Sequence, residues 1–128
     1  MSAATIAVIG AGSWGTALAI QLARNGHHVI LWGHEPSEVN ALQRDRENRQ
    51  YLPGIAFPDN LQPEPALAAV IAPADEVLVV VPSHAFASVC TRIAEQRPDI
   101  GSISWATKGF DPASQELLGV VARRLLPD

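Results

Sequence analysis

A short apolar run that ends directly in a glycine-rich turn is the feature that most constrains the fold. Residues Thr5–Ile9 are β-branched or small aliphatic residues, in the near-continuous pattern of a strand buried on both faces. The turn that follows, Gly10 to Gly15, reads Gly-Ala-Gly-Ser-Trp-Gly, and Trp14–Arg24 carries apolar side chains at helical spacing before an Asn-Gly stop. The segment predicts a strand, a tight turn and a helix in immediate succession.

Apolar runs continue to alternate with helical patterns along the chain. Further strands are expected over Val29–Trp32, Val77–Val81 and, from a weaker pattern, Ser102–Thr107. Further helices are expected over Pro36–Leu42, Phe86–Arg97 and Gln115–Leu126. Asn48–Pro63 is rich in proline, and we interpret it as a surface loop with room for one short strand. Because such alternation requires right-handed crossovers, we expect an α/β, doubly wound, mostly parallel sheet with helices on both faces, and one domain over residues 1–128.

The glycine-rich turn also carries chemistry, since it matches the dinucleotide fingerprint of Rossmann-type folds. Gly10 allows the tight turn out of the strand, Gly12 lets a pyrophosphate approach the backbone, and Gly15 lets the helix lie close to the sheet. The backbone N–H groups of Ser13 and Trp14 would face the anion at the helix N-terminus. The Trp14 ring either lines the cofactor groove or packs against the sheet edge.

The end of the second predicted strand bears on the choice between NAD and NADP. An NAD-selective site usually has an acidic residue there, to bind the ribose hydroxyls. In this chain Gly33 or His34 occupies that position, and Glu35 comes later. The lack of an anion favours tolerance of NADP. Alternatively, His34 caps a turn and Glu35 bends back to the ribose.

Two further strand ends place candidate groups at the same edge of the sheet. Pro82 stops its strand and would set the backbone beneath the nicotinamide half of a dinucleotide, while Ser83 is expected to cap the next helix. His84 is a candidate for proton transfer, although no partner for it is evident. Lys108, before Gly109, could supply a positive charge to a phosphorylated substrate or to the cofactor, or could simply extend into water.

Charge and cysteine content exclude several other classes of function. The formal net charge is -4 and the nine Lys and Arg residues are scattered, which argues against nucleic-acid binding. The one cysteine, Cys90, cannot form an internal disulfide and is expected to be a buried thiol, as suits a reducing cytoplasm. No apolar run is long enough for a signal peptide or a membrane span, and no metal site is expected.

Taken together, these motifs resemble bacterial NAD(P)-dependent glycerol-3-phosphate dehydrogenase in its N-terminal half, and the resemblance runs in order through essentially all 128 residues. The motifs that carry it are Ile9–Leu18, Leu31–His34, Tyr51–Pro53, Val80–His84 and Trp105–Gly109. The glycine turn is common to many dehydrogenases, whereas its combination with the Pro-Ser-His and Ala-Thr-Lys-Gly strand ends is specific.

The resemblance implies reversible hydride transfer between NAD(P)H and dihydroxyacetone phosphate or sn-glycerol 3-phosphate, for phospholipid synthesis. It implies cofactor contacts for Ser13, Trp14 and His34, and contacts to both cofactor and substrate for Lys108. Tyr51 would lie over the cofactor groove, or would instead pin its loop to the body of the domain.

The resemblance also implies that the catalytic lysine and most substrate contacts belong to a helical C-terminal domain absent from this chain. We therefore expect no catalytic residue here, weak cofactor binding and no turnover, with a homodimer possible in the full-length protein. Two alternatives stay open at this point. The chain could be the cofactor domain of another 2-hydroxyacid or sugar-nucleotide dehydrogenase, or a non-catalytic module that senses NAD(P)H.

Overall fold

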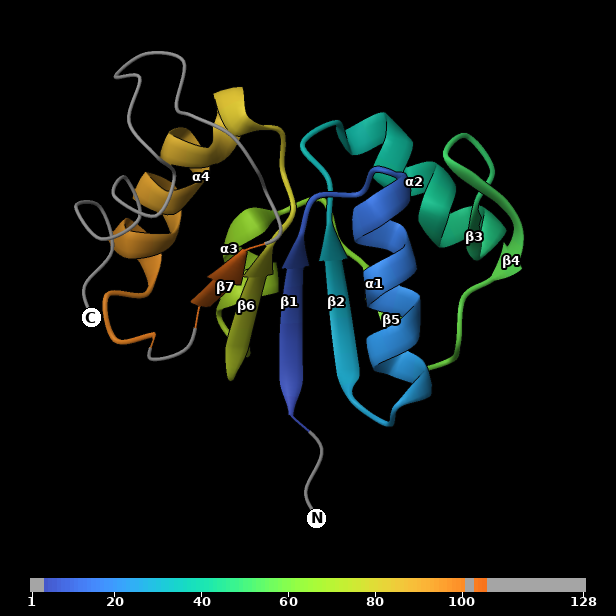
Figure 1. Cartoon of the computed structure of the whole chain (residues 1–128), viewed down its shortest axis with the longest axis horizontal. Helices are drawn as coiled ribbons and strands as arrows, with labels where there is room; N and C mark the ends of the chain where they lie inside the picture. The colour runs from blue at the N-terminus through green and yellow to red at the C-terminus, as the bar shows by residue number, and fades with distance from the viewer. Residues whose placement is uncertain (1–3, 101–102, 106–128) are drawn as a thin grey trace.

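Five parallel strands form the central sheet of the computed structural model, which describes residues 4–100 and 103–105 (Figure 1). In spatial order they are β5 (Leu61–Pro63), β2 (His28–Trp32), β1 (Thr5–Ile9), β6 (Glu76–Val79) and β7 (Ile103–Trp105). The chain leaves β1 toward β2 and β5, and later returns to its other side as β6 and β7. This reversal beside β1 is the topological switch point at which open α/β sheets bind ligands. The predicted Rossmann-type, doubly wound fold is confirmed.

Within the residues that the structure describes, four helices cover the two faces of the sheet. They are α1 (Ser13–Arg24), α2 (Pro36–Asp45), α3 (Leu67–Ile71) and α4 (Ser83–Gln96). Buried residues of α1 and α2 share one core cluster with the sheet, and buried residues of α3 and α4 share the other. Figure 1 shows α1 in front of the sheet and α3 behind it.

The pattern of β1 explains why its sequence is apolar throughout. Ile6 and Val8 belong to the core cluster under α1, whereas Ala7 and Ile9 belong to the cluster under α3 and α4. Successive side chains of a strand point to opposite faces, so a strand in the middle of a three-layer structure needs apolar residues at every position. All four of these side chains are buried.

The proline-rich segment over residues 48–63 differs from the prediction of a loop with room for one strand. It contributes to an antiparallel hairpin of β3 (Glu47–Asn48) and β4 (Leu52–Ala56), and it contains β5 at the edge of the main sheet. Pro63 is buried within β5. An edge strand tolerates proline because its outer side needs no ladder hydrogen bond, and this is the reason that the proline signal was misleading.

Other boundaries agree with the sequence to within a few residues, with one functional difference. Helix α4 begins at Ser83, three residues before the predicted start, and Pro82 occupies its N-cap position without a side-chain cap hydrogen bond. The prediction that Ser83 caps this helix is therefore wrong, since Ser83 is its first helical residue. The predicted helix over 115–126 and Lys108 lie outside the described residues.

Candidate functional site

Two glycines of the turn between β1 and α1 are required by the fold itself. Gly10 has φ +129°, a conformation that side chains rarely adopt, and a Cβ atom there would collide with the backbone carbonyl of Val80 on the neighbouring segment. A Cβ atom at Gly15 would overlap the carbonyl oxygen of Gly10. Both predicted reasons, a tight turn and close packing, are present in the structure.

Gly12 differs from both, because neither its backbone conformation nor its described surroundings require a glycine. Its φ is -77°, which any residue adopts, and a Cβ atom would have no atom of the described residues within 4 Å. Gly12 is the N-cap residue of α1, and no side chain caps the first N–H groups of that helix. These N–H groups and the positive end of the helix dipole are therefore open to an anion.

A cavity of about 890 Å³ opens at this turn, over the carboxyl ends of β1, β2 and β6. The described residues that line it are Gly10, Ala11, Gly12, Ser13, Trp14, Gly15, Trp32, Gly33, His34, Glu38, Tyr51, Val80, Val81, Pro82, His84, Ala85, Ser88, Val89 and Arg92. They include eight of the nine residues predicted from the sequence to contact a cofactor, and the ninth, Lys108, lies outside the described residues. The cavity is large enough for a dinucleotide on the usual scale of ligand sites.

The two aromatic residues at the cavity were each left with two interpretations. Trp14 is 58% exposed and lines the cavity, which favours a groove-lining ring over one packed against the sheet edge. Tyr51 is 46% exposed and also lines the cavity. A ring this exposed does not pin its loop to the body of the domain.

The residue that does hold the Tyr51 loop is Asn48, which sequence reasoning missed. Its side chain is only 2% exposed. Nδ2 donates to the carbonyl of Ala11 at 3.0 Å and to Oγ1 of Thr16 at 2.9 Å, while Oδ1 accepts the backbone N–H of Tyr51 at 3.1 Å. One carboxamide thus joins the glycine turn, the first helix and the Tyr51 loop. An asparagine in a predicted loop gave no signal of this role.

Comparison with known proteins places the chain among glycerol-3-phosphate dehydrogenases. Residues 5–128 match the family model described as the N-terminus of NAD-dependent glycerol-3-phosphate dehydrogenase. The chain belongs to this family. The glycerol-3-phosphate dehydrogenase [NAD(P)+] of Xanthomonas oryzae pv. oryzae is 54% identical over 121 residues, and that of Shewanella sediminis is 53% identical over 123 residues. These matches cover 94% and 96% of the chain but only 36% of each relative.

Solved structures agree with this assignment. The glycerol-3-phosphate dehydrogenase of Coxiella burnetii is 40% identical, with a TM-score of 0.93 over 98% of this chain and 38% of that one. A UDP-glucose dehydrogenase from Pyrobaculum islandicum has a TM-score of 0.70 at 15% identity, with 97% of this chain and 33% of that one covered, and so shares the fold alone. Both the sequence and the structure thus favour the glycerol-3-phosphate dehydrogenase family over a sugar-nucleotide dehydrogenase.

In this member of the glycerol-3-phosphate dehydrogenase family, the charged groups at the end of β2 differ from one of the two predicted arrangements. His34 lines the cavity, whereas Glu35 is the N-cap residue of α2 and is not among the lining residues. The carboxylate that does line the cavity belongs to Glu38, one turn further along α2. The structure therefore gives no support to Glu35 bending back toward a ribose.

Arg92 is a second lining residue that sequence reasoning missed. The lining residues on α4 are His84, Ala85, Ser88, Val89 and Arg92. Counted from Ala85, the later three follow at three, four and seven residues, which is the spacing of one helix face, and His84 is adjacent to that face. The signal was available, because Pro82 was already expected at the site and the face that starts just after it continues through the predicted helix.

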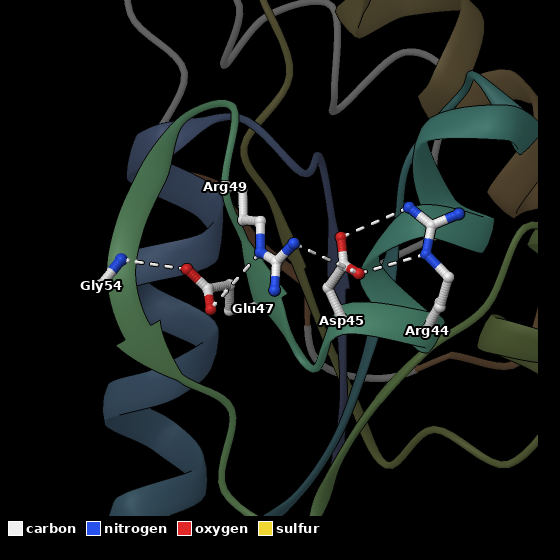
Figure 2. A network of polar contacts seen from close by, with 5 residues as sticks. All are labelled: Arg44, Asp45, Glu47, Arg49 and Gly54. Carbon is white, nitrogen blue, oxygen red and sulfur yellow. Dashed lines mark hydrogen bonds and ion pairs between the residues drawn. The ribbon is translucent and has the colours of Figure 1, made fainter.

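A network of ion pairs connects the end of α2 with the β3–β4 hairpin, which carries Tyr51 (Figure 2). Asp45 at the end of α2 pairs with Arg44 at 3.1 Å and Arg49 at 3.8 Å, and Arg49 also reaches Glu47 on β3. The hydrogen bond from Arg44 lowers the pKa of Asp45 below its ordinary value. Ion pairs of exposed arginines like these stabilise a fold little.

Three further expectations concern the cysteine, metal binding and membrane spans. Cys90 is buried in α4, and burial raises the pKa of its thiol to about 12, so the expected buried thiol is confirmed. Within the part of the chain that the structure describes, no three His, Cys, Asp or Glu residues are grouped so that they could hold a metal ion. No helix over the same residues combines the length and apolar character needed to cross a membrane.

Proposed function

We propose that this chain is the cofactor-binding part of an oxidoreductase that transfers hydride between NAD(P)H and dihydroxyacetone phosphate or sn-glycerol 3-phosphate. The observation that carries the proposal is Gly12. Neither its φ nor its packing requires glycine, yet it stands at the uncapped start of α1 and faces the cavity. A pyrophosphate lying against those N–H groups would occupy the space that a side chain there would fill.

The fold sets the direction in which a dinucleotide would lie. With the pyrophosphate at Gly12 and Ser13, the adenosine half extends toward the end of β2 at His34, and the nicotinamide half toward Pro82 at the end of β6. When bound, the nicotinamide supplies or accepts the hydride. The residues of this chain hold and orient the cofactor, and we assign Lys108 to contact both cofactor and substrate.

Either NAD or NADP fits the charges described at the cavity. Gly33 and His34 put no carboxylate at the position where NAD-selective sites usually have one. The close relatives carry both cofactors in their names.

The wider role of the protein follows from the family and not from the described residues. Since the chain spans about 36% of the length of its relatives, we propose that substrate binding and proton transfer depend on residues of a further, helical domain. From membership of the family we also propose a role in phospholipid synthesis, a cytoplasmic location and a homodimer of the full-length protein. A non-catalytic module that senses NAD(P)H is the alternative, and a turnover assay of the full-length protein would distinguish the two.

Calorimetric titration of the chain with NADH and NADPH tests the proposal, with Gly12→Ala as the decisive variant. Because a methyl group at Gly12 meets no described protein atom within 4 Å, the variant should fold, and its unfolding temperature should fall only by the small amount expected when alanine replaces glycine at an N-cap. It should weaken both cofactors by about tenfold or more, equivalent to about 1.4 kcal/mol. Gly15→Ala is the contrasting variant, and we expect it to lower the unfolding temperature. Unchanged affinity in Gly12→Ala would contradict the proposed position of the pyrophosphate.

A further inference from the structure

We propose that Arg92 recognises the 2′-phosphate of NADP and is thereby a specificity-determining residue of this site. The inference rests on the proposed function, because it assumes that the cavity binds a dinucleotide with its adenosine half toward the end of β2. It goes beyond that function by assigning the choice between the two cofactors to a residue of α4, far in sequence from the strand end at which selectivity is usually read.

The guanidinium of Arg92 lies over the ring of a buried tryptophan, Trp32. The guanidinium carbon lies 5.5 Å from the centre of the Trp32 ring. Trp32 is 4% exposed, and its Nε1 donates to the carbonyl of Pro65 at 3.0 Å. This cation–π contact favours a position of the exposed Arg92 guanidinium over the buried, hydrogen-bonded ring. Since Trp32 is the last residue of β2, this place is at the adenosine end of the cavity.

The N–H groups of Arg92 form no hydrogen bond with another residue in the described part of the chain. A guanidinium that lies over an aromatic ring keeps its N–H groups for other partners. Among the described residues, no carboxylate forms an ion pair with Arg92, whereas Arg44, Arg49 and Arg97 each pair with one. Figure 2 shows two of these paired arginines.

Arg92 is also the one lysine or arginine among the described lining residues of the cavity. A permanent cation with unused donors at the wall of a ligand site is suited to bidentate binding of a phosphate. The pyrophosphate is already accounted for at the start of α1. The anion that remains at the adenosine end is the 2′-phosphate, which NADP has and NAD lacks.

Glu38 supplies the opposing charge at the same end. It lies in the first turn of α2 and is the one carboxylate among the described lining residues. A carboxylate accepts hydrogen bonds from ribose hydroxyls and repels a phosphate. Arg92 therefore favours NADP and Glu38 favours NAD. Replacing Arg92 should shift the preference toward NAD, and replacing Glu38 should shift it toward NADP.

The test uses two nucleotides that differ only in the 2′-phosphate, namely 2′,5′-ADP and 5′-ADP, titrated by calorimetry into the 128-residue chain. Arg92→Met keeps the apolar stem over Trp32 and should weaken 2′,5′-ADP by about tenfold or more while 5′-ADP changes less than about twofold. Glu38→Gln should strengthen 2′,5′-ADP relative to 5′-ADP. Arg24→Met removes an exposed arginine from the end of α1, outside the cavity lining, and should leave both affinities unchanged.

Each alternative outcome overturns the inference. Equal weakening of both nucleotides by Arg92→Met would mean that Arg92 supports the adenosine or the fold, and no weakening would mean that it contacts neither. If Arg24→Met weakened 2′,5′-ADP as much as Arg92→Met does, the weakening would reflect the loss of one positive charge and not the position of Arg92. If the wild type binds neither nucleotide nor cofactor, the proposed function itself fails. If the wild type binds and Arg92→Met does not discriminate, only the role of Arg92 fails.

Discussion

Asn48 satisfies three polar groups with one buried carboxamide, two of them on the glycine turn and the helix that follows it. Replacing Asn48 with alanine removes all of these bonds and leaves the Thr16 hydroxyl and the Tyr51 N–H without their partner. We expect the free energy of unfolding to fall by about 1–3 kcal/mol. Because the glycine turn and Tyr51 line the cavity, we also expect NADPH to bind about tenfold more weakly.

Asn60 is the matched control for this prediction. Its Nδ2 also makes two bonds to backbone carbonyls, those of Ala23 and His27, each at 2.7 Å, but it does not line the cavity. Asn60→Ala should therefore lose stability and keep its cofactor affinity. If chemical denaturation and calorimetry gave the same pair of losses for both variants, Asn48 would be a general stabilising residue with no special relation to the site.

The Cys90 thiol predicts a pH dependence of stability. Burial raises its pKa in the folded chain to about 12, from an ordinary value of 9.0. At alkaline pH the unfolded chain releases this proton more readily than the folded one, so unfolding becomes more favourable. The contribution is fully present below about pH 9 and is lost between about pH 9 and pH 12. Denaturation of the wild type and Cys90→Ala across this range should show a steeper decline for the wild type, and parallel curves would contradict the prediction.

At the scale of secondary-structure elements, Arg97 at the C-cap of α4 forms hydrogen bonds with the end of α3 and the residues that follow it. Its Nη1 donates to the carbonyls of Ile71 at 3.0 Å, Ala72 at 2.8 Å and Ala74 at 3.3 Å, and its guanidinium pairs with Asp99. Hydrogen bonds from a charged donor to carbonyls at the end of a helix are stronger than average.

We expect Arg97→Met to lower the free energy of unfolding by about 2 kcal/mol, measured by urea denaturation. Cofactor affinity should not change, since Arg97 does not line the cavity. Arg44→Met is the control, because Arg44 also pairs with a carboxylate but is exposed and binds no helix carbonyl. Equal stability of Arg97→Met and the wild type would contradict the role assigned to these bonds.

The elements that sequence reasoning found are those whose signal is local. β1 was predicted to the residue because a strand buried on both faces has no polar positions. For residues 48–63 the sequence predicted only a loop with room for one short strand. The β3–β4 hairpin and the place of β5 in the main sheet were missed because they depend on non-local contacts. Leu61 in β5 pairs with Val29 in β2, and Asn48 at the end of β3 binds the glycine turn.

The same distinction applies to the site. Seven residues in a recognisable turn or at a strand end could be predicted from their pattern, Tyr51 was predicted from the family resemblance, and all eight meet at one cavity. Glu38 and Arg92 carry no motif, and they reach the cavity only because α2 and α4 present one face to it. Helical spacing from a known site residue is the one signal that could have indicated Arg92.

For the whole molecule, we expect the 128-residue chain to bind NADPH and yet not reduce dihydroxyacetone phosphate. Hydride transfer needs the substrate and a proton donor held in line with the nicotinamide, and we assign those groups to a domain beyond this chain. The measurement is the near-ultraviolet absorbance of NADPH in a mixture with the substrate. A longer relative of the family, assayed alongside, is the positive control. Steady loss of absorbance with this chain alone would contradict the expectation.

The central position of β1 also governs the order in which a growing polypeptide can assemble its ligand site. β1 pairs with β2 early, since Thr5 is aligned with His28. Its other neighbour is far downstream, and the N–H of Thr5 binds Asp75, 70 residues later. The backbone of Val80 that lies against Gly10 emerges later still. Val80, Val81 and Pro82 of the cavity wall are therefore synthesised after the glycine turn and the end of β2, so a growing chain can complete the cavity only once β6 has been made.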